Sequence, residues 1–344
     1  MKTQTDPLTA AEMGKLWASY LGNSMGKLVL SYYLKNVEDV EIKKVLETGL
    51  AMSQSYVNTI NSIFAQADFP IPIAFTDEDV DLDAPRLFYD EFYLHYLQYL
   101  GKAGMSIYSV AIPLVTRNNI RDFFVKCLHE TSRLMMDVND ILKSKGRLMN
   151  APIVTSPTKV DFIKKQSFLN GFFGEIRTLH GLEVAHLYGN INNDVTSKAL
   201  IIGFRQGARN EKVKKYLERG ERINEKHIQM LSDKLTEDNI PAPSLIDHLV
   251  TPSVTPVFSD KLMVFHKIDM FSMKIREYAN GLSLNGRRDL GALYAKCQLD
   301  VSLYVEDGAN IMIDHGWMEQ PPEVVNRVDL IHKNENNTQE QAAY

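Results

Sequence analysis

The run Lys-Lys-Val-Leu-Glu-Thr-Gly at residues 43–49 recurs as Lys-Lys-Tyr-Leu-Glu-Arg-Gly at residues 214–220, and this recurrence decides the fold. Extended outward without a gap, residues 8–85 lie over residues 179–256, since 179 − 8 and 256 − 85 are both 171. One deleted residue then moves the offset to 170, which holds through Arg117/Arg287 and Gly146/Gly316. Because each copy is long enough to close its own core, the repeat is a whole domain.

The bulk composition is that of a soluble globular protein. Of 344 residues, 44% are hydrophobic and 24% are charged, and the formal net charge is −5, so no global field favours nucleic acid or anionic lipid. No apolar run approaches the ~18 residues that a membrane span needs, and we expect a cytoplasmic protein. Cys127 and Cys297, one in each copy, are expected to be small buried apolar residues in a reducing compartment.

Apolar residues recur at helical spacing almost everywhere, as in Leu16, Tyr20, Met25, Leu28 and Tyr32. With polar residues on the opposite faces, this period predicts an all-α protein with four helices in each copy. The expected helices are 8–36, 39–67, 86–112 and 117–145 in the first copy, and 176–207, 210–237, 257–282 and 287–315 in the second.

The connections between these helices predict their arrangement. Only a few residues join helices one and two, and helices three and four, so each pair forms an antiparallel hairpin. Helices two and three are separated by some twenty residues that include Pro70, Pro72 and Pro85. A helix of 28 residues is ~42 Å long, and about twenty extended residues can span that length. This predicts two tandem ferritin-like four-helix bundles with a long crossover, although a connection that only wanders over the surface remains an alternative.

The sequence divides into four parts on this interpretation. We expect a first bundle at 1–147, a linker at 148–158, a second bundle at 159–322 and a polar, partly disordered tail at 323–344. The phenylalanine-rich segment at 159–175 has no counterpart before the first copy, and we expect it to extend or precede the first helix of the second bundle.

Metal-binding ferritin-like bundles need Glu-x-x-His motifs, because residues three apart on a helix can hold one ion. The first copy contains none, whereas Glu183-Val-Ala-His186 provides one in the second copy. His227 lies at a similar depth, and a crossover places Asp269 and Asp300 within about a turn of it. The candidate ligands for iron or manganese are therefore Glu183, His186, His227, Asp269 and Asp300; an up-down-up-down order would bring His266 with Glu306 or Asp307 there instead.

A plainer interpretation stands beside the metal hypothesis. Histidines on long amphipathic helices are more often hydrogen-bonded side chains than ligands, and Glu-x-x-His occurs by chance in many helical proteins. The Lys43-Lys44 and Lys214-Lys215 pairs are typical of a solvated helix face. There is no glycine-rich phosphate loop, nucleophile elbow or Cys-x-x-Cys pattern. A small apolar ligand held inside a bundle remains a third possibility.

Several segments carry a resemblance to a known family. They are Phe168-Leu-Asn-Gly-Phe-Phe-Gly-Glu-Ile-Arg177, Leu182–Tyr188, Lys212–His227, Tyr304-Val-Glu-Asp-Gly-Ala-Asn-Ile-Met-Ile313 and Gly316-Trp-Met-Glu-Gln-Pro-Pro322. In these the chain resembles an uncharacterised bacterial family, domain of unknown function number 3231, of duplicated ferritin-like bundles from spore-forming bacteria that are similar to spore coat proteins. The resemblance implies the fold and supplies no catalytic residues.

The leading hypothesis is a non-catalytic ferritin-like structural or interaction protein, cytoplasmic and associated with sporulation or the spore coat. Its partners would be other spore or coat proteins, and it would be a monomer whose bundles pack as an internal pseudo-dimer. The alternative is a di-metal oxidoreductase that uses the second bundle. Elemental analysis of protein purified without added metal separates the two.

Overall fold

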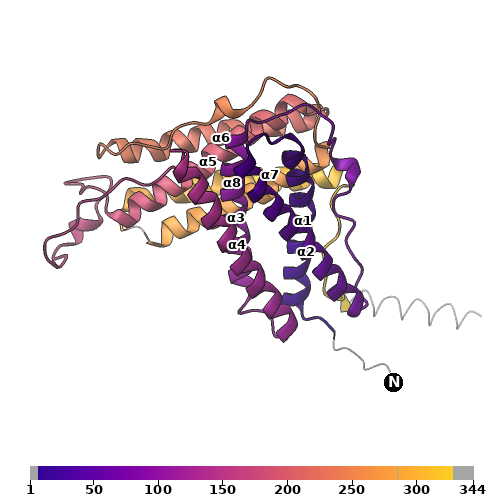
Figure 1. Cartoon of the computed structure of the whole chain (residues 1–344). Helices are drawn as coiled ribbons and strands as arrows, with labels where there is room; N and C mark the ends of the chain where they lie inside the picture. The colour runs from indigo at the N-terminus through magenta and orange to yellow at the C-terminus, as the bar shows by residue number, and fades with distance from the viewer. Residues whose placement is uncertain (1–6, 285, 328–344) are drawn as a thin grey trace, which may run out of the picture.

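A computed structural model describes residues 7–284 and 286–327 of the chain. Its helices confirm the all-α prediction, and the described parts contain no β-strand beyond two isolated bridges. The first repeat holds α1 (Ala10–Asn36), α2 (Val40–Gln66), α3 (Asp90–Ala111) and α4 (Asn118–Ser144). The second holds α5 (Gly181–Gly207), α6 (Glu211–Thr236), α7 (Asp260–Leu284) and α8 (Arg288–Asp314). The two groups run in different directions (Figure 1).

Side-chain caps fix where the helices begin. Thr9 and Glu12 form a reciprocal capping box at the start of α1, and Asp39 accepts hydrogen bonds from the first turn of α2. Each cap satisfies backbone N–H groups that have no partner within the helix. The second repeat begins α5 with a capping box of His180 and Glu183, and α6 with the cap Asn210.

Matched glycines end the last helix of each repeat. Gly146 and Gly316 have φ of 67° and 66°, the left-handed region that glycine adopts without a steric penalty. The following N–H groups, of Arg147 and Trp317, donate to the carbonyls of Leu142 and Met312, both at 2.8 Å. This closes the helix end by the Schellman pattern. The repeated glycines therefore mark the same backbone turn in both copies.

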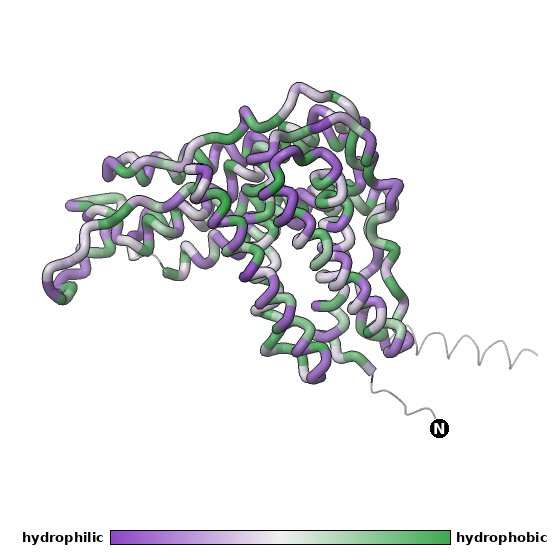
Figure 2. The backbone as a smooth tube through the Cα atoms, in the orientation of Figure 1, coloured by the Kyte–Doolittle hydropathy of each residue, from purple (hydrophilic) through white to green (hydrophobic). Residues whose placement is uncertain are grey.

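Within each repeat, the helix ends meet in a fixed pattern. The Asp90 carboxylate at the start of α3 accepts hydrogen bonds from the N–H groups of Glu38 and Asp39, which join α1 to α2. At the opposite end of α1, Glu12 accepts from the N–H groups of Thr116 and Arg117, which join α3 to α4. Asp260 and Glu183 make the corresponding contacts in the second repeat. Buried apolar side chains form the core between the helices. Hydrophobic and hydrophilic residues alternate along each helix (Figure 2).

The long connections at 67–89 and 237–259 pair with each other across the two repeats. Val80 forms a bridge with Phe258, and Phe88 forms one with Val250. Asp81 N–H donates to Val257 O at 2.7 Å and Thr251 N–H donates to Leu87 O at 3.0 Å, with two further bonds of the same kind between 79 and 259 and between 89 and 249. Val250 is the equivalent of Val80, and Phe258 is the equivalent of Phe88, since each pair is 170 residues apart. The two bridges are therefore related by exchange of the repeats, and the pairing is pseudo-twofold.

This pairing corrects the position of the deletion in the repeat alignment. The left-handed residues Asp68 and Asn239, which follow α2 and α6, are still 171 apart. The short 3₁₀ helices Asp77–Asp79 and Asp247–Leu249 are already 170 apart. The extra residue of the first repeat therefore lies before residue 77, where Ala74 alone adopts φ of 52°. Alignment of Pro85 with Pro256 at offset 171 is wrong, because the backbone there has already shifted.

The segment that joins the repeats is irregular. Gln166–Leu169 forms a single 3₁₀ turn, and α5 begins at Gly181 and not at 176, so the phenylalanine-rich segment precedes the helix without extending it. In Figure 1 this segment extends to the left, away from α1–α4. Of the predicted tail, residues 328–344 lie outside the described residues.

Candidate functional site

Buried charged side chains lie at the centre of the second bundle. The ammonium of Lys274 on α7 lies 2.8 Å from a carboxylate oxygen of Asp194 on α5, with exposed fractions of 1% and 0%. Lys274 also donates a hydrogen bond to the side-chain oxygen of Asn224 on α6. Buried charges are retained only when they are paired and hydrogen-bonded, so these contacts are what allow Lys274 to lie in the core. We call the set Lys274, Asp194, Asn224, Tyr278, His227 and Asp300 the lysine network.

A chain of hydrogen bonds leads from this pair to the surface. The Tyr278 hydroxyl lies 2.9 Å from a carboxylate oxygen of Asp194, and the Nδ1 of His227 lies 3.0 Å from the same hydroxyl. The Nε2 of His227 lies 3.1 Å from Asp300, which is partly exposed and accepts a hydrogen bond from Lys226. The lysine network thus joins all four helices of the second bundle.

Burial is the largest single influence on the pKa values of Lys274, His227 and Asp300. It lowers the pKa of Lys274, although the Asp194 carboxylate opposes that shift. It likewise lowers the pKa of His227, against Asp194 and Asp300. For Asp300, burial alone would raise the pKa, but hydrogen bonds from Lys226 and His227 outweigh it and lower the pKa.

A second buried lysine lies seven residues earlier, two turns along the same face of α7. Lys267 is fully buried and donates to the hydroxyl of Ser197 at 2.9 Å. Burial, followed by the repulsion of Lys274, holds its pKa well below the usual range. Its amino group donates hydrogen bonds to both the hydroxyl and the backbone carbonyl of Ser197.

The first bundle repeats the hydrogen-bonded frame of this network but lacks its lysine. Asn23, equivalent to Asp194, donates to the Tyr108 hydroxyl at 3.2 Å, and Tyr108 is equivalent to Tyr278. Tyr56 donates to Glu130 at 3.0 Å, as His227 contacts Asp300. The position of Lys274 is taken by Gly104.

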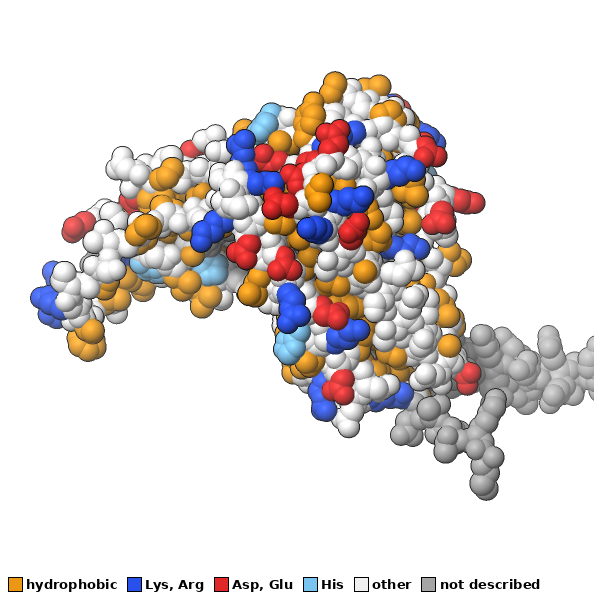
Figure 3. Space-filling view, in the orientation of Figure 1, with side chains coloured by type: hydrophobic (Ala, Val, Ile, Leu, Met, Phe, Trp, Pro, Cys, Tyr) orange, Lys and Arg blue, Asp and Glu red, His pale blue; other side chains and the backbone are white. Residues whose placement is uncertain are grey.

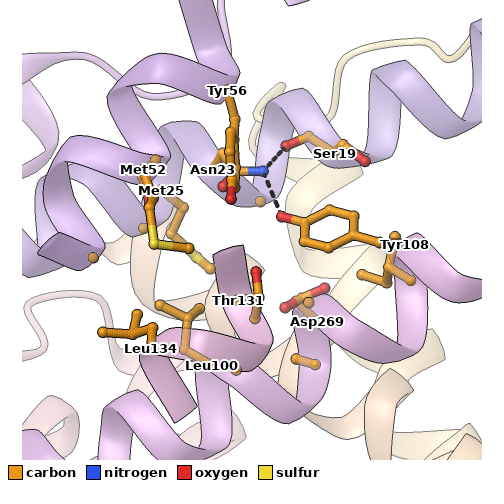
Figure 4. A pocket seen from close by; sticks show the side chains of 18 of the residues that line it. Ser19, Asn23, Met25, Met52, Tyr56, Leu100, Tyr108, Thr131, Leu134 and Asp269 are labelled. Atoms are coloured by element: carbon orange, nitrogen blue, oxygen red, sulfur yellow. Dashed lines mark hydrogen bonds between the residues drawn. The ribbon is translucent and has the colours of Figure 1, made fainter. Parts of the chain in front are cut away.

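A cavity of about 70 Å³ replaces the lysine in the first bundle. Asn23, Tyr108 and Thr131 supply polar groups to it, and methionines and leucines supply the apolar wall: Met25, Met52, Leu100 and Leu134 (Figure 4). The glycines 22, 26, 49, 101 and 104 also line it. The missing side chains therefore leave space that the neighbouring residues do not fill.

One wall of this cavity comes from the other repeat. Asp269 on α7 reaches into the first bundle and lies beside Thr131 below the ring of Tyr108 (Figure 4). Within the described residues its carboxylate accepts no hydrogen bond, and the side chain is half-buried. Burial raises its pKa, with Arg276 opposing. The cavity thus combines an apolar wall with one carboxyl group that accepts no hydrogen bond from the described residues.

The predicted ligand Glu183 has a different role. Its oxygens accept two hydrogen bonds from Arg177, both at 2.7 Å, and further bonds from the N–H groups of His180, Gly286 and Arg287. Burial would raise its pKa, but Arg177 and the backbone donors outweigh burial and lower it. Glu183 is the equivalent of Glu12 and ties the start of α5 to the α7–α8 connection.

The five predicted metal ligands do not meet at one point. Only His227 and Asp300 contact each other, and both belong to the lysine network. His186 has a buried Nε2 without a partner, and Asp269 lines the cavity of the first bundle. Among the residues that the structure describes, no group of three or more His, Cys, Asp or Glu side chains is arranged to hold a metal ion. The alternative candidate His266 lies between the repeats, 2.7 Å from the Tyr96 hydroxyl.

Sequence reasoning missed Asp194, Lys267 and Lys274. Their signal was present, because Lys274 lies three residues after Phe271 and four before Tyr278, within the apolar stripe of α7. A charge at such a position is almost never fully buried unless it is paired. The two cysteines are buried and free, as predicted.

Comparisons with known proteins agree with the duplication. Residues 1–160 and 167–330 both match the model of the family described as protein of unknown function DUF3231. A comparison with curated proteins found no similar sequence. A solved structure of a candidate spore coat protein from Bacillus halodurans is similar at 16% identity and a TM-score of 0.37, and the match covers 44% of this chain and 98% of that one. On the two family matches, the chain belongs to the DUF3231 family.

Proposed function

We propose that this protein is a non-catalytic structural or interaction protein built from two ferritin-like bundles, and that it works in association with the spore. The bundles pack as an internal pseudo-dimer through their paired long connections. In this proposal the domains are those that the repeat predicts, 1–147 and 159–322, and the chain is a monomer.

The contacts at the helix ends support the ferritin-like order. The start of α3 lies beside the connection between α1 and α2, as the bonds from Glu38 and Asp39 to Asp90 require. Because α2 runs away from that end, residues 67–89 must return along the bundle before α3 can begin. Two hairpins joined by one such return are the ferritin-like form of a four-helix bundle.

The single observation that carries the non-catalytic proposal is the position of Lys274. Di-metal bundles direct carboxylates and histidines from four helices toward the centre. Here an ammonium lies among Asp194, Asn224 and Tyr278, so the charge of the buried carboxylate is already balanced within the protein. Such an arrangement stabilises one packing of the helices and presents no open position to a substrate.

The connecting segment supports a role in interaction. Phe162, Ile163 and Phe173 are 79%, 66% and 87% exposed, and Lys164 and Lys165 lie beside them in sequence. Exposed apolar residues gathered on one segment are typical of a contact surface. In the space-filling view, the outermost part of the molecule at the left carries hydrophobic side chains together with basic ones of the Lys and Arg class (Figure 3). We propose that this segment contacts other spore proteins.

Localisation in a sporulating cell tests the proposal. A full-length fusion to a fluorescent protein should concentrate on the developing spore, and the combined change Phe162→Ser, Ile163→Ser and Phe173→Ser should disperse it. The matched control replaces two exposed leucines of α8, Leu299→Ser and Leu303→Ser, which are 61% and 46% exposed. An even distribution of the native fusion, or turnover of ferrous iron or peroxide by the purified protein, would contradict the proposal.

A further inference from the structure

We propose that the cavity of the first bundle binds a short primary alkylammonium ion, which takes the place that the side chain of Lys274 fills in the second bundle. This inference goes beyond the structural role proposed above and does not depend on it. The second repeat serves as an internal template for the ligand of the first.

The template is justified by equivalent contacts. The Asn23 to Tyr108 bond and the Tyr56 to Glu130 bond have their counterparts in the Asp194 to Tyr278 and His227 to Asp300 contacts. Two of the polar contacts around Lys274 thus have counterparts between equivalent residues of the first bundle. What differs is the side chain in the middle, which is present as Lys274 and absent at Gly104.

The size of the space fits the missing side chain. A dry cavity of ~150 Å³ binds benzene, which has six heavy atoms, so at the same ratio about 70 Å³ corresponds to about three, close to the number in the missing side chain. The part of a lysine side chain beyond Cβ has four heavy atoms, three carbons and one nitrogen. The n-propylammonium ion has the same four atoms in the same order.

The charge fits as well. Asn23 is neutral where the second repeat has Asp194, but Asp269 enters the cavity from α7 and supplies a carboxyl group. This group has no hydrogen-bond partner in the described residues, and the Ser19 hydroxyl in the same wall is buried without one. A buried polar group without a partner, such as the Ser19 hydroxyl, is costly, and a carboxylate makes strong hydrogen bonds with a charged donor, so a ligand that brings N–H donors and a positive charge is stabilised there.

The apolar wall selects an alkylammonium over a bare metal ion. Met25, Met52, Leu100 and Leu134 face the cavity with carbon and sulfur atoms. A hard divalent cation such as calcium or magnesium needs six or more oxygen ligands, which this wall does not provide. A three-carbon chain instead packs against these side chains while its ammonium reaches Asp269.

Ligand-observed NMR with the full-length protein tests the proposal. Titration with n-propylammonium chloride should saturate, and n-propanol, which has the same size and no charge, should bind at least tenfold more weakly. Asp269→Asn, which keeps the shape and removes the charge, should weaken propylammonium binding at least tenfold. Glu47→Gln makes the same charge change on the exposed face of α2 and should leave binding unchanged.

A second variant tests whether a lysine side chain at position 104 and propylammonium compete for the same cavity. Gly104→Lys should fill the cavity and abolish propylammonium binding, whereas Gly14→Lys, on the exposed face of α1 with no atom within 4 Å of its added Cβ, should not. Should Gly104→Lys fail to fold because its Cβ would lie 3.1 Å from the Tyr108 ring, the Asp269→Asn comparison still decides. Equal binding of propanol and propylammonium, unchanged binding by Asp269→Asn, or no saturation by the native protein would each overturn the proposal.

Discussion

The ammonium of Lys274 lies 2.8 Å from a carboxylate oxygen of Asp194 in the core of the second bundle, and both side chains are buried. Removal of one partner leaves the other charged and buried without compensation, which typically costs ~3–5 kcal/mol. Asn23 shows that an amide can replace the carboxylate within the same hydrogen-bonded frame. Substitutions of Lys274 and Asp194 can therefore distinguish the free-energy cost of an uncompensated charge from the cost of an altered side-chain shape.

We expect Lys274→Met to lower the free energy of unfolding by about 3 kcal/mol, because it strands the Asp194 carboxylate. The double variant Asp194→Asn with Lys274→Met should recover at least about half of that loss. Urea unfolding followed by circular dichroism measures both. Losses that simply add in the double variant would show that the two charges are not coupled.

Glu183→Gln should lower the free energy of unfolding by about 2 kcal/mol, because the bonds from Arg177 and the backbone lose their charged acceptor. Glu218→Gln is the control, since Glu218 pairs with Arg222 on the surface of α6 and such pairs contribute ~0–1 kcal/mol. Denaturant midpoints compare the two. Equal denaturant midpoints for the two variants would contradict a structural role for Glu183.

Dialysis against a chelator tests the metal hypothesis without any substitution. A resident ion at 100 times its dissociation constant would stabilise the fold by ~2.7 kcal/mol, which is several degrees in Tm. Because Glu183 and Asp300 already have protein partners, we expect Tm to change by less than about 1 °C. A fall of about 5 °C that iron or manganese reverses would restore the sequence-based prediction.

Glu319→Ala should loosen the contact between the C-terminal segment and the first repeat. The Glu319 carboxylate accepts from the N–H groups of Ile73 and Ala74, and Trp17 and Trp317 line the same pocket. Loss of this charged acceptor should cost about 2 kcal/mol and shift tryptophan emission to the red. Glu323→Ala, an exposed neighbour, is the control. Unchanged emission in Glu319→Ala would argue against the contact.

His266 should make stability depend on pH. Burial between the repeats lowers its pKa to about 3, whereas in the unfolded chain it titrates near ~6.5. Below pH 6.5 the unfolded state binds a proton that the folded state does not, so stability falls as pH falls toward 3. His266→Gln should reduce the loss between pH 7 and 4.5 by about 2 kcal/mol, while His129→Gln, on the exposed face of α4, should not. Parallel pH profiles for all three proteins would contradict this assignment.

The sequence predicted the helices because backbone requirements repeat with the fold. An added Cβ at Gly220 would clash with the Tyr304 hydroxyl, so the second copy needs a glycine where its last helix approaches, and the equivalent Gly49 packs against Leu134, the residue equivalent to Tyr304. The site was harder to predict. Glu183 and His186 have the spacing of a metal motif, but the spacing does not reveal that Arg177 and the α7–α8 connection already bind Glu183.

Asp269 shows the other limit of the sequence. Its spacing along α7 places Asp269 near the centre of the second bundle, yet Asp269 lines the cavity of the first bundle. That placement depends on how the two bundles pack, which follows from the paired connections at Val80/Phe258 and Phe88/Val250. No single-helix pattern contains this information, because it arises from contacts between residues 162 to 178 positions apart.

Those paired connections have a consequence for how such a molecule can change over generations. In a symmetric dimer of single repeats, one codon would alter both centres at once, so a lysine lost from one would be lost from both. Covalent fusion removes that constraint: residue 104 can become glycine while residue 274 stays lysine. The seam formed by Val80 and Phe258 keeps the two copies in register, so one half preserves the stability of the molecule while the other is free to acquire a new specificity.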